Sequence, residues 1–181
     1  MYQLSSVADA KIEVGNYAMY VGSVGATATA ITINLGAGMV KTFSYNPEMF
    51  TSQAGNAPDP ISGVARETCT LDIDLIEYDA SAFSSLSNGM LASTTGGSVM
   101  TVGGQVSSIA GVGMKLVNTR KLNGGSTQTT TYVIQKAIMA GGFTTSPKSD
   151  NDADPLNVYS FDLLCKQAMT TAQTIFTKTI S

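Results

Sequence analysis

Residues 67–77 read ETCTLDIDLIE, and this stretch decides the fold of the chain. Apolar and polar side chains alternate along it. Because successive side chains of a β-strand point to opposite faces of a sheet, the period of two predicts a strand with one buried and one polar face. The predicted inward set is Cys69, Leu71, Ile73 and Leu75, and the outward set is Thr68, Thr70, Asp72 and Asp74.

The same alternation recurs on both sides of this strand. Residues 11–21 change phase at Gly15-Asn16, which is typical of a β-bulge because one extra residue turns the following side chains to the other face. An Asn123-Gly124-Gly125 turn joins residues 114–117 to a long strand over 127–143. The further inward sets are Tyr17, Met19 and Val21; Ile31, Ile33 and Leu35; Tyr132, Ile134 and Ile138; and Tyr159, Phe161, Leu163 and Cys165. We therefore expect a mainly β chain, an antiparallel sandwich or barrel that forms a single domain over residues 1–181.

One short segment departs from the strand pattern. Asp79 is a suitable N-cap, and Asn88-Gly89 supplies a stop signal. Between them the apolar residues Phe83, Leu86 and Met90 follow helical spacing. These features predict one short amphipathic helix over residues 79–90 that flanks the sheet.

Two polar segments separate predicted strands. Asn46–Gly63 contains three prolines and is expected to be a long hairpin loop, functional or mobile. Thr144–Pro155 carries acids at alternate positions, as a calcium loop does: Asp150, Asp152 and Asp154. The calcium-loop pattern also needs a Gly and an acid where this chain has Pro155 and Phe161. A solvated hairpin tip is therefore favoured, with a calcium site as the lesser alternative.

The composition excludes much enzyme chemistry. The chain has no histidine and no tryptophan, and 13% of its residues are charged. Without imidazole there is no Ser-His-Asp or Cys-His site, and a zinc site would need carboxylates or a second chain. The net charge of −3 argues against nucleic-acid binding, which requires a basic surface. We expect no enzymatic activity and no cofactor.

Two thiols are present, Cys69 and Cys165, each in an alternating apolar strand. This setting favours buried reduced cysteines over a disulfide. The sequence has no secretory signal at its start, and no apolar run approaches the ~18 residues of a membrane helix. We expect a chain made and kept in a cytoplasm, with no membrane partner.

Two further arrangements favour structural over catalytic interpretations. Asp72 and Asp74 share a strand face, but that face offers Thr rather than the aromatic platform of a glycoside hydrolase, so a solvent-facing strand is expected. The glycine-rich stretches lack a following Lys-Ser or Lys-Thr and indicate bulges and turns rather than a phosphate cradle. A Ser-Lys nucleophile pair stays open.

The remaining features favour self-association. The chain has 22 Thr, 19 Ser and 18 Gly, and its low charge reduces the desolvation penalty of burying a surface between chains. Hydroxyl-rich strands can add to the sheet edge of a neighbour. Methionines outside the clearest strand patterns would supply adaptable packing: Met39, Met49, Met90 and Met169. We therefore expect a subunit whose function is its contact with copies of itself.

In the order of its parts the chain resembles the tail tube (major tail) proteins of tailed bacteriophages. The resemblance covers nearly the whole chain and is one of layout and composition. The matching parts, in order, are strands around Lys11–Gly22 and Ala30–Leu35, the segment Lys41–Tyr45, the loop Asn46–Gly63, the strand Arg66–Tyr78, the helix Asp79–Met90, and strands through Tyr132–Met139 and Val158–Gln167.

The resemblance implies a hexameric ring whose inner sheets line a channel, with rings stacked into a tube through which the genome is ejected. It implies that the long loop Asn46–Gly63 reaches a neighbouring ring or subunit as an inter-ring contact, with Met49 and Phe50 as its apolar anchors and Asp59 and Pro60 as further candidate contacts. Asp72 and Asp74 become candidate channel-lining residues, because like charge keeps DNA from adhering to the wall. The implied partners are the chain itself, sheath, terminator and baseplate or tip proteins, and DNA that passes without specific binding. The implied location is the virion tail, assembled in the host cytoplasm.

Other readings stay open. Another self-assembling β-rich subunit, such as a pilus or fimbrial subunit or a capsid decoration protein, shares the composition. A non-catalytic carbohydrate-binding β-sandwich would need exposed tyrosines on a sheet face, since tryptophan is absent.

Overall fold

The computed structural model describes residues 16–52, 61–78, 91–93, 100–102, 111–122, 125–146, 158–168 and 174–181. Within these ranges the secondary structure consists of β-strands, with no helix. The helix predicted over 79–90 lies outside the described residues. The strands are β1 Asn16–Gly22, β2 Ile33–Ser52, β3 Ile61–Tyr78, β4 Leu91–Ser93, β5 Met100–Val102, β6 Val112–Lys121, β7 Thr127–Ser146, β8 Val158–Lys166 and β9 Phe176–Ile180.

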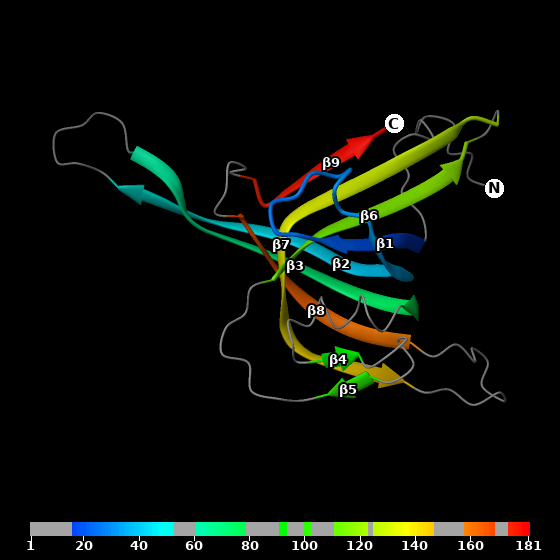
Figure 1. Cartoon of the computed structure of the whole chain (residues 1–181). Helices are drawn as coiled ribbons and strands as arrows, with labels where there is room; N and C mark the ends of the chain where they lie inside the picture. The colour runs from blue at the N-terminus through cyan, green and yellow to red at the C-terminus, as the bar shows by residue number, and fades with distance from the viewer. Residues whose placement is uncertain are drawn as a thin grey trace, which may run out of the picture.

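The large sheet closes on itself. Its strand order is β6-β1-β2-β3-β8-β7-β9, and β6 pairs in addition with β7. Every pairing in it is antiparallel. Because the first strand of the order pairs with β7, the circuit β6-β1-β2-β3-β8-β7 forms a barrel, with β9 added along β7 (Figure 1). Strands β4 and β5 form a separate two-stranded sheet. The expected mainly β, antiparallel fold is confirmed for the described residues.

The core lies inside the barrel and follows the alternation predicted from the sequence. The inward set of β3 is fully buried, as are Met19 and Val21 of β1, and Phe161 and Leu163 of β8 are at most 2% exposed. On β6, Met114 and Leu116 face the same interior. Burial of these apolar side chains is the main stabilising contribution, at about 1.5–3 kcal/mol for each large side chain.

Two predicted inward positions are wrong. Ile33 is 52% exposed although its cross-strand partner Val21 is fully buried; it is the first residue of β2 and lies at the end of the strand. Ile138 is only partly buried while Ala137 and Met139 are buried, because β7 shifts register against β6 before it continues along β8. An extra residue in one strand reverses the facing of every later side chain.

The predicted loop over 46–63 is wrong in its extent. Strand β2 continues to Ser52 and β3 begins at Ile61, so that part of the expected loop is a two-stranded ladder with one register shift, between Glu48 and Met49. The pairing of β2 with β1 ends at Met39, which leaves the second edge of β2 without β1 over the rest of its length. A proline such as Pro47 is compatible with a strand that has an unpaired edge. Residues 53–60, between the two strands, lie outside the described part of the chain.

Candidate functional site

A two-stranded arm extends from the barrel. The pairing of β3 with β8 begins at Cys69, so residues 46–52 of β2 and 61–68 of β3 pair only with each other among the described strands. In Figure 1 this ribbon projects far beyond the body of the barrel, at the left of the view. We call residues 46–52 and 61–68 the arm.

The arm carries exposed apolar side chains on both of its faces. Met49 is 63% exposed and Val64, its cross-strand partner, is 48% exposed. Phe50 is 45% exposed and lies opposite Gly63, and a Cβ at Gly63 would approach the Phe50 ring to 2.8 Å. The glycine therefore lets the ring lie across the ribbon. A two-stranded ribbon has no interior, so nothing else in the arm can cover these side chains.

The root of the arm is held to the barrel by an aromatic cluster. The Phe43 ring meets Tyr132 and Phe176 edge-on, with centroids 5.7 and 4.7 Å away. The Tyr45 ring lies 6.4 Å from Phe176, and the Tyr45 hydroxyl donates a hydrogen bond of 2.6 Å to Glu67. Each edge-to-face pair contributes about 0.5–1.5 kcal/mol beyond area burial. These contacts fix the direction in which the arm leaves the barrel.

A cavity of about 420 Å³ lies beside this root. A second hollow of about 230 Å³ adjoins this cavity, and both are lined by Glu67, Gln167 and Ile175. Gln167 donates a hydrogen bond of 3.2 Å to Glu67 between the two. The residues that line the larger cavity are Arg66, Glu67, Thr68, Leu164, Cys165, Lys166, Gln167 and Ile175.

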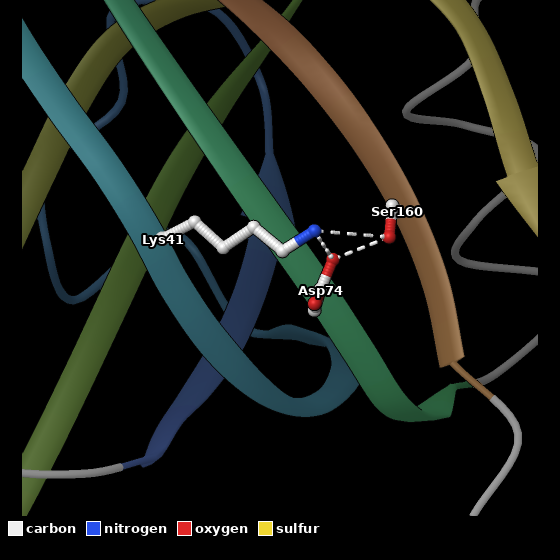
Figure 2. A network of polar contacts seen from close by, with 3 residues as sticks. All are labelled: Lys41, Asp74 and Ser160. Carbon is white, nitrogen blue, oxygen red and sulfur yellow. Dashed lines mark hydrogen bonds and ion pairs between the residues drawn. The ribbon is translucent and has the colours of Figure 1, made fainter.

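A polar network occupies the outer face of β3, where the sequence predicts a solvent-facing strand. Figure 2 shows Lys41 of β2 reaching over β3 toward Asp74 and toward Ser160 of β8. The Lys41 Nζ lies 2.8 Å from Asp74 Oδ1, and the Ser160 hydroxyl donates to the same oxygen at 2.5 Å. Lys41 falls at a register shift between Val40 and Thr42, and such a bulge re-aims a side chain. Asp74 is only 8% exposed, so the solvent-facing expectation is wrong for this residue.

Asp72 lies on the same face of β3, but its electrostatic surroundings are less favourable. Its cross-strand partner on β8 is Asp162, and like charges directly opposite one another are destabilising. Desolvation raises the pKa of Asp72, Lys41 opposes that rise, and Asp162 and Asp74 add to it. The hydrogen bond to Asp74 raises the pKa of Lys41, with burial acting in the opposite direction. The face therefore gathers three carboxylates around one lysine that stays protonated at neutral pH.

This protonation state bears on the Ser-Lys pair that the sequence left open. The Lys41 Nζ lies 3.4 Å from the Ser160 oxygen, near enough to resemble a nucleophile and base. A general base must be neutral to accept a proton, and the carboxylate beside Lys41 favours the charged form. Ser160 directs its hydroxyl proton to Asp74 instead. The arrangement acts as an ion-pair network between three strands.

The structure places the two predicted groups of site residues in different regions. Met49 and Phe50 lie on the arm, and Asp72 and Asp74 lie on the barrel face of β3. The other predicted contacts and the predicted acidic hairpin tip lie outside the described residues: Asp59, Pro60, Asp150, Asp152 and Asp154. Lys41 and Ser160 could not be predicted as site residues, because the bulge at Lys41 has no glycine or proline signal beside it in the sequence.

Two other kinds of feature are absent from the described residues. Within those ranges no group of three or more Cys, Asp or Glu side chains is placed to hold a metal ion. The described part of the chain also contains no helix that is long and apolar enough to cross a membrane.

Comparison with known proteins does not assign the chain to a family. No family model matches it, and no curated protein matches it. Among solved structures, one similar chain belongs to a cryo-EM structure of an extracellular contractile injection system, the PVC sheath-tube complex in its extended state. The identity is 11% over 99% of both chains, with a TM-score of 0.45. A likeness at this level carries no conclusion about function.

Proposed function

We propose that this chain is a structural subunit that assembles with copies of itself. The observation that supports the proposal is the arm, which presents Met49, Phe50 and Val64 to solvent far from the core of its own barrel. Large exposed apolar surfaces mark contacts with other molecules. A second copy is the occupant we favour, because every copy carries both an apolar arm and an open cavity at the arm root.

The finer form of the proposal is a hexameric ring stacked into a tail tube of the bacteriophage kind. It rests on the resemblance of this chain to tail tube proteins. In that family a long hairpin loop reaches a neighbouring ring or subunit. In this form the arm makes the contact between subunits, and the acidic face of Asp72, Asp74 and Asp162 lines the channel for the passing genome. Sheath, terminator and tip proteins are the partners, and the virion tail, built in the host cytoplasm, is the location.

Electron microscopy and light scattering of the purified chain test assembly directly. The wild-type chain is expected to form rings or tubes and to show a mass that rises with concentration. The double variant Met49→Ser, Phe50→Ser is expected to weaken association about tenfold or more, because each apolar side chain contributes about 1.5 kcal/mol or more when fully buried. Circular dichroism should show that the barrel of the variant stays folded.

Ile33→Ser is the matched control, since Ile33 is similarly exposed but lies at the barrel end of β2. It should leave the association unchanged. A wild-type chain that stays monomeric over a wide concentration range would contradict the proposal. An Ile33 variant that weakens association as much as the arm variant would contradict the role of the arm.

A further inference from the structure

The two cysteines of the chain, 96 positions apart in sequence, are direct cross-strand partners. In the ladder between β3 and β8, Cys69 is paired with Cys165. Both thiols are free, with Cys69 fully buried and Cys165 2% exposed. Both belong to the core cluster, so their side chains leave the sheet on the same face. Sequence spacing alone gave no sign that they meet.

The backbone of such a pair suits a disulfide. Directly opposed residues of an antiparallel ladder have Cα atoms about 4.5 or 5.5 Å apart, depending on the hydrogen-bonding position. Disulfides span Cα separations of about 4.4–6.8 Å, so both kinds of position lie within range. The pairing of Cys69 with Cys165 therefore places the two residues within the range of backbone separations that a bridge can span.

An open cavity reaches one thiol of the pair. Cys165 lines the cavity of about 420 Å³ at the arm root. Burial raises the pKa of both thiols, so both are protonated at neutral pH and react slowly there. Slow reaction keeps the pair reduced during synthesis in a reducing compartment, and exposure to an oxidising one then allows the bridge to form.

The position of the pair gives the bridge a structural consequence. Cys69 is the β3 residue nearest the arm that pairs with β8, and Tyr45 of the arm root lies opposite it on β2. We propose that Cys69 and Cys165 are a disulfide site that, when oxidised, locks the root of the arm to the barrel wall. The proposal goes beyond self-assembly and does not depend on it.

The oxidant we name is a small-molecule disulfide. One cysteine sulfur, as its thiolate, attacks the reagent, forms a mixed disulfide and releases one thiol. The second cysteine then displaces the remaining reagent sulfur and releases a second thiol. The two cysteines lose two electrons and two protons, and the reagent disulfide gains them as two thiols.

Oxidation of the folded wild-type chain by oxidised glutathione tests the site. The free thiols, counted after unfolding, should fall from two to none, and the digested chain should yield one peptide pair linked through Cys69 and Cys165. Bridging should be faster at pH 9 than at pH 7, because the thiolate is the attacking form. The midpoint of denaturant unfolding should rise and return to its starting value after reduction, because the bridge restricts the unfolded chain.

The single variants Cys69→Ala and Cys165→Ala are controls, and oxidation should not raise their unfolding midpoints. Because the main comparison is oxidised against reduced wild type, the test holds even if a variant folds poorly. Two thiols that persist in the folded chain, glutathione bound to each cysteine, or a bridge between two chains would each overturn the proposal. A bridge within one chain that leaves the unfolding midpoint unchanged would overturn the locking role.

Discussion

At the scale of single residues, the two acids of the β3 outer face differ in what faces them. Asp74 has a lysine and a hydroxyl directed at one carboxylate oxygen. Asp72 faces Asp162 across the ladder instead. A carboxylate that faces a lysine and a hydroxyl stabilises the fold, whereas one that lies opposite a like charge weakens it. The same residue type at alternate positions therefore has opposite effects on stability.

Asp72→Asn is expected to stabilise the chain. The raised pKa of Asp72 means that the folded state binds this proton more tightly than the unfolded state. Stability should therefore fall as the pH rises from the ordinary carboxyl value, 3.8, through the raised folded value, and the loss persists above it. Replacing Asp72 by Asn removes this loss of stability. The free energy of unfolding should therefore rise by about 0.2–1 kcal/mol at pH 7, and the difference should disappear near pH 3. Denaturant unfolding at both pH values measures it.

Glu48→Gln is the matched control for this prediction. Glu48 lies opposite Arg66 on the arm, so neutralising it removes an attraction between unlike charges. Glu48→Gln should leave the free energy of unfolding unchanged or lower it slightly at pH 7. A gain for Glu48→Gln equal to that for Asp72→Asn would point to the net charge of the chain and contradict the account based on Asp162.

At the scale of elements, the β2–β3 ladder forms part of the barrel wall along one half of its length and the arm along the other half. Its barrel half buries the inward residues of β3, while its arm half exposes apolar side chains. The two halves are joined without a loop, so that the arm is a continuation of the barrel wall. Close backbone approach at Gly38, in the barrel half, is part of this construction. A Cβ at Gly38 would lie 2.1 Å from the Asp74 carbonyl oxygen.

Gly38→Ala is expected to cost about 1–3 kcal/mol of unfolding free energy, because backbone atoms must move to admit the methyl group. Gly63→Ala on the arm is the comparison, since the nearest obstacle there is the movable Phe50 ring. It should cost less than about 1 kcal/mol, because an alanine also restricts the unfolded chain. Equal costs in chemical denaturation would show that the close approach at Gly38 does not constrain the barrel.

At the scale of the whole molecule, the barrel and the arm differ in what they contribute to the free energy of folding. Pairing of β6 with β7 closes the circuit of barrel strands, and the core lies within it. The arm adds exposed apolar surface and little of the core. This division suits a chain in which folding depends on the barrel and assembly on the arm.

An armless chain should fold and fail to assemble. Tyr45 and Cys69 are cross-strand partners, so Asn-Gly in place of residues 46–68 would join them through a two-residue hairpin turn. We expect a β-type circular dichroism spectrum and cooperative unfolding, with a monomeric mass at concentrations where the full chain associates. Rings or tubes formed by the armless chain would contradict the role of the arm.

The sequence by itself determined the strand character of the chain and most of the inward set. A period of two is a local property, so Cys69 to Leu75 and Phe161 to Cys165 could be assigned without any knowledge of their partners. The low charge and the absence of histidine likewise follow from composition. Ile138 departs from the predicted inward set, because a bulge depends on the register with a neighbouring strand, and Ile33 departs from it at the first residue of β2.

Only the tertiary structure decided which distant strands meet. It closed the barrel, extended the expected loop into an arm, brought Lys41 and Ser160 to Asp74, and placed Cys69 beside Cys165. These features depend on pairing between segments far apart in the chain. No local pattern encodes such pairing, because the free energy of each ladder comes from the partner strand as much as from the strand itself.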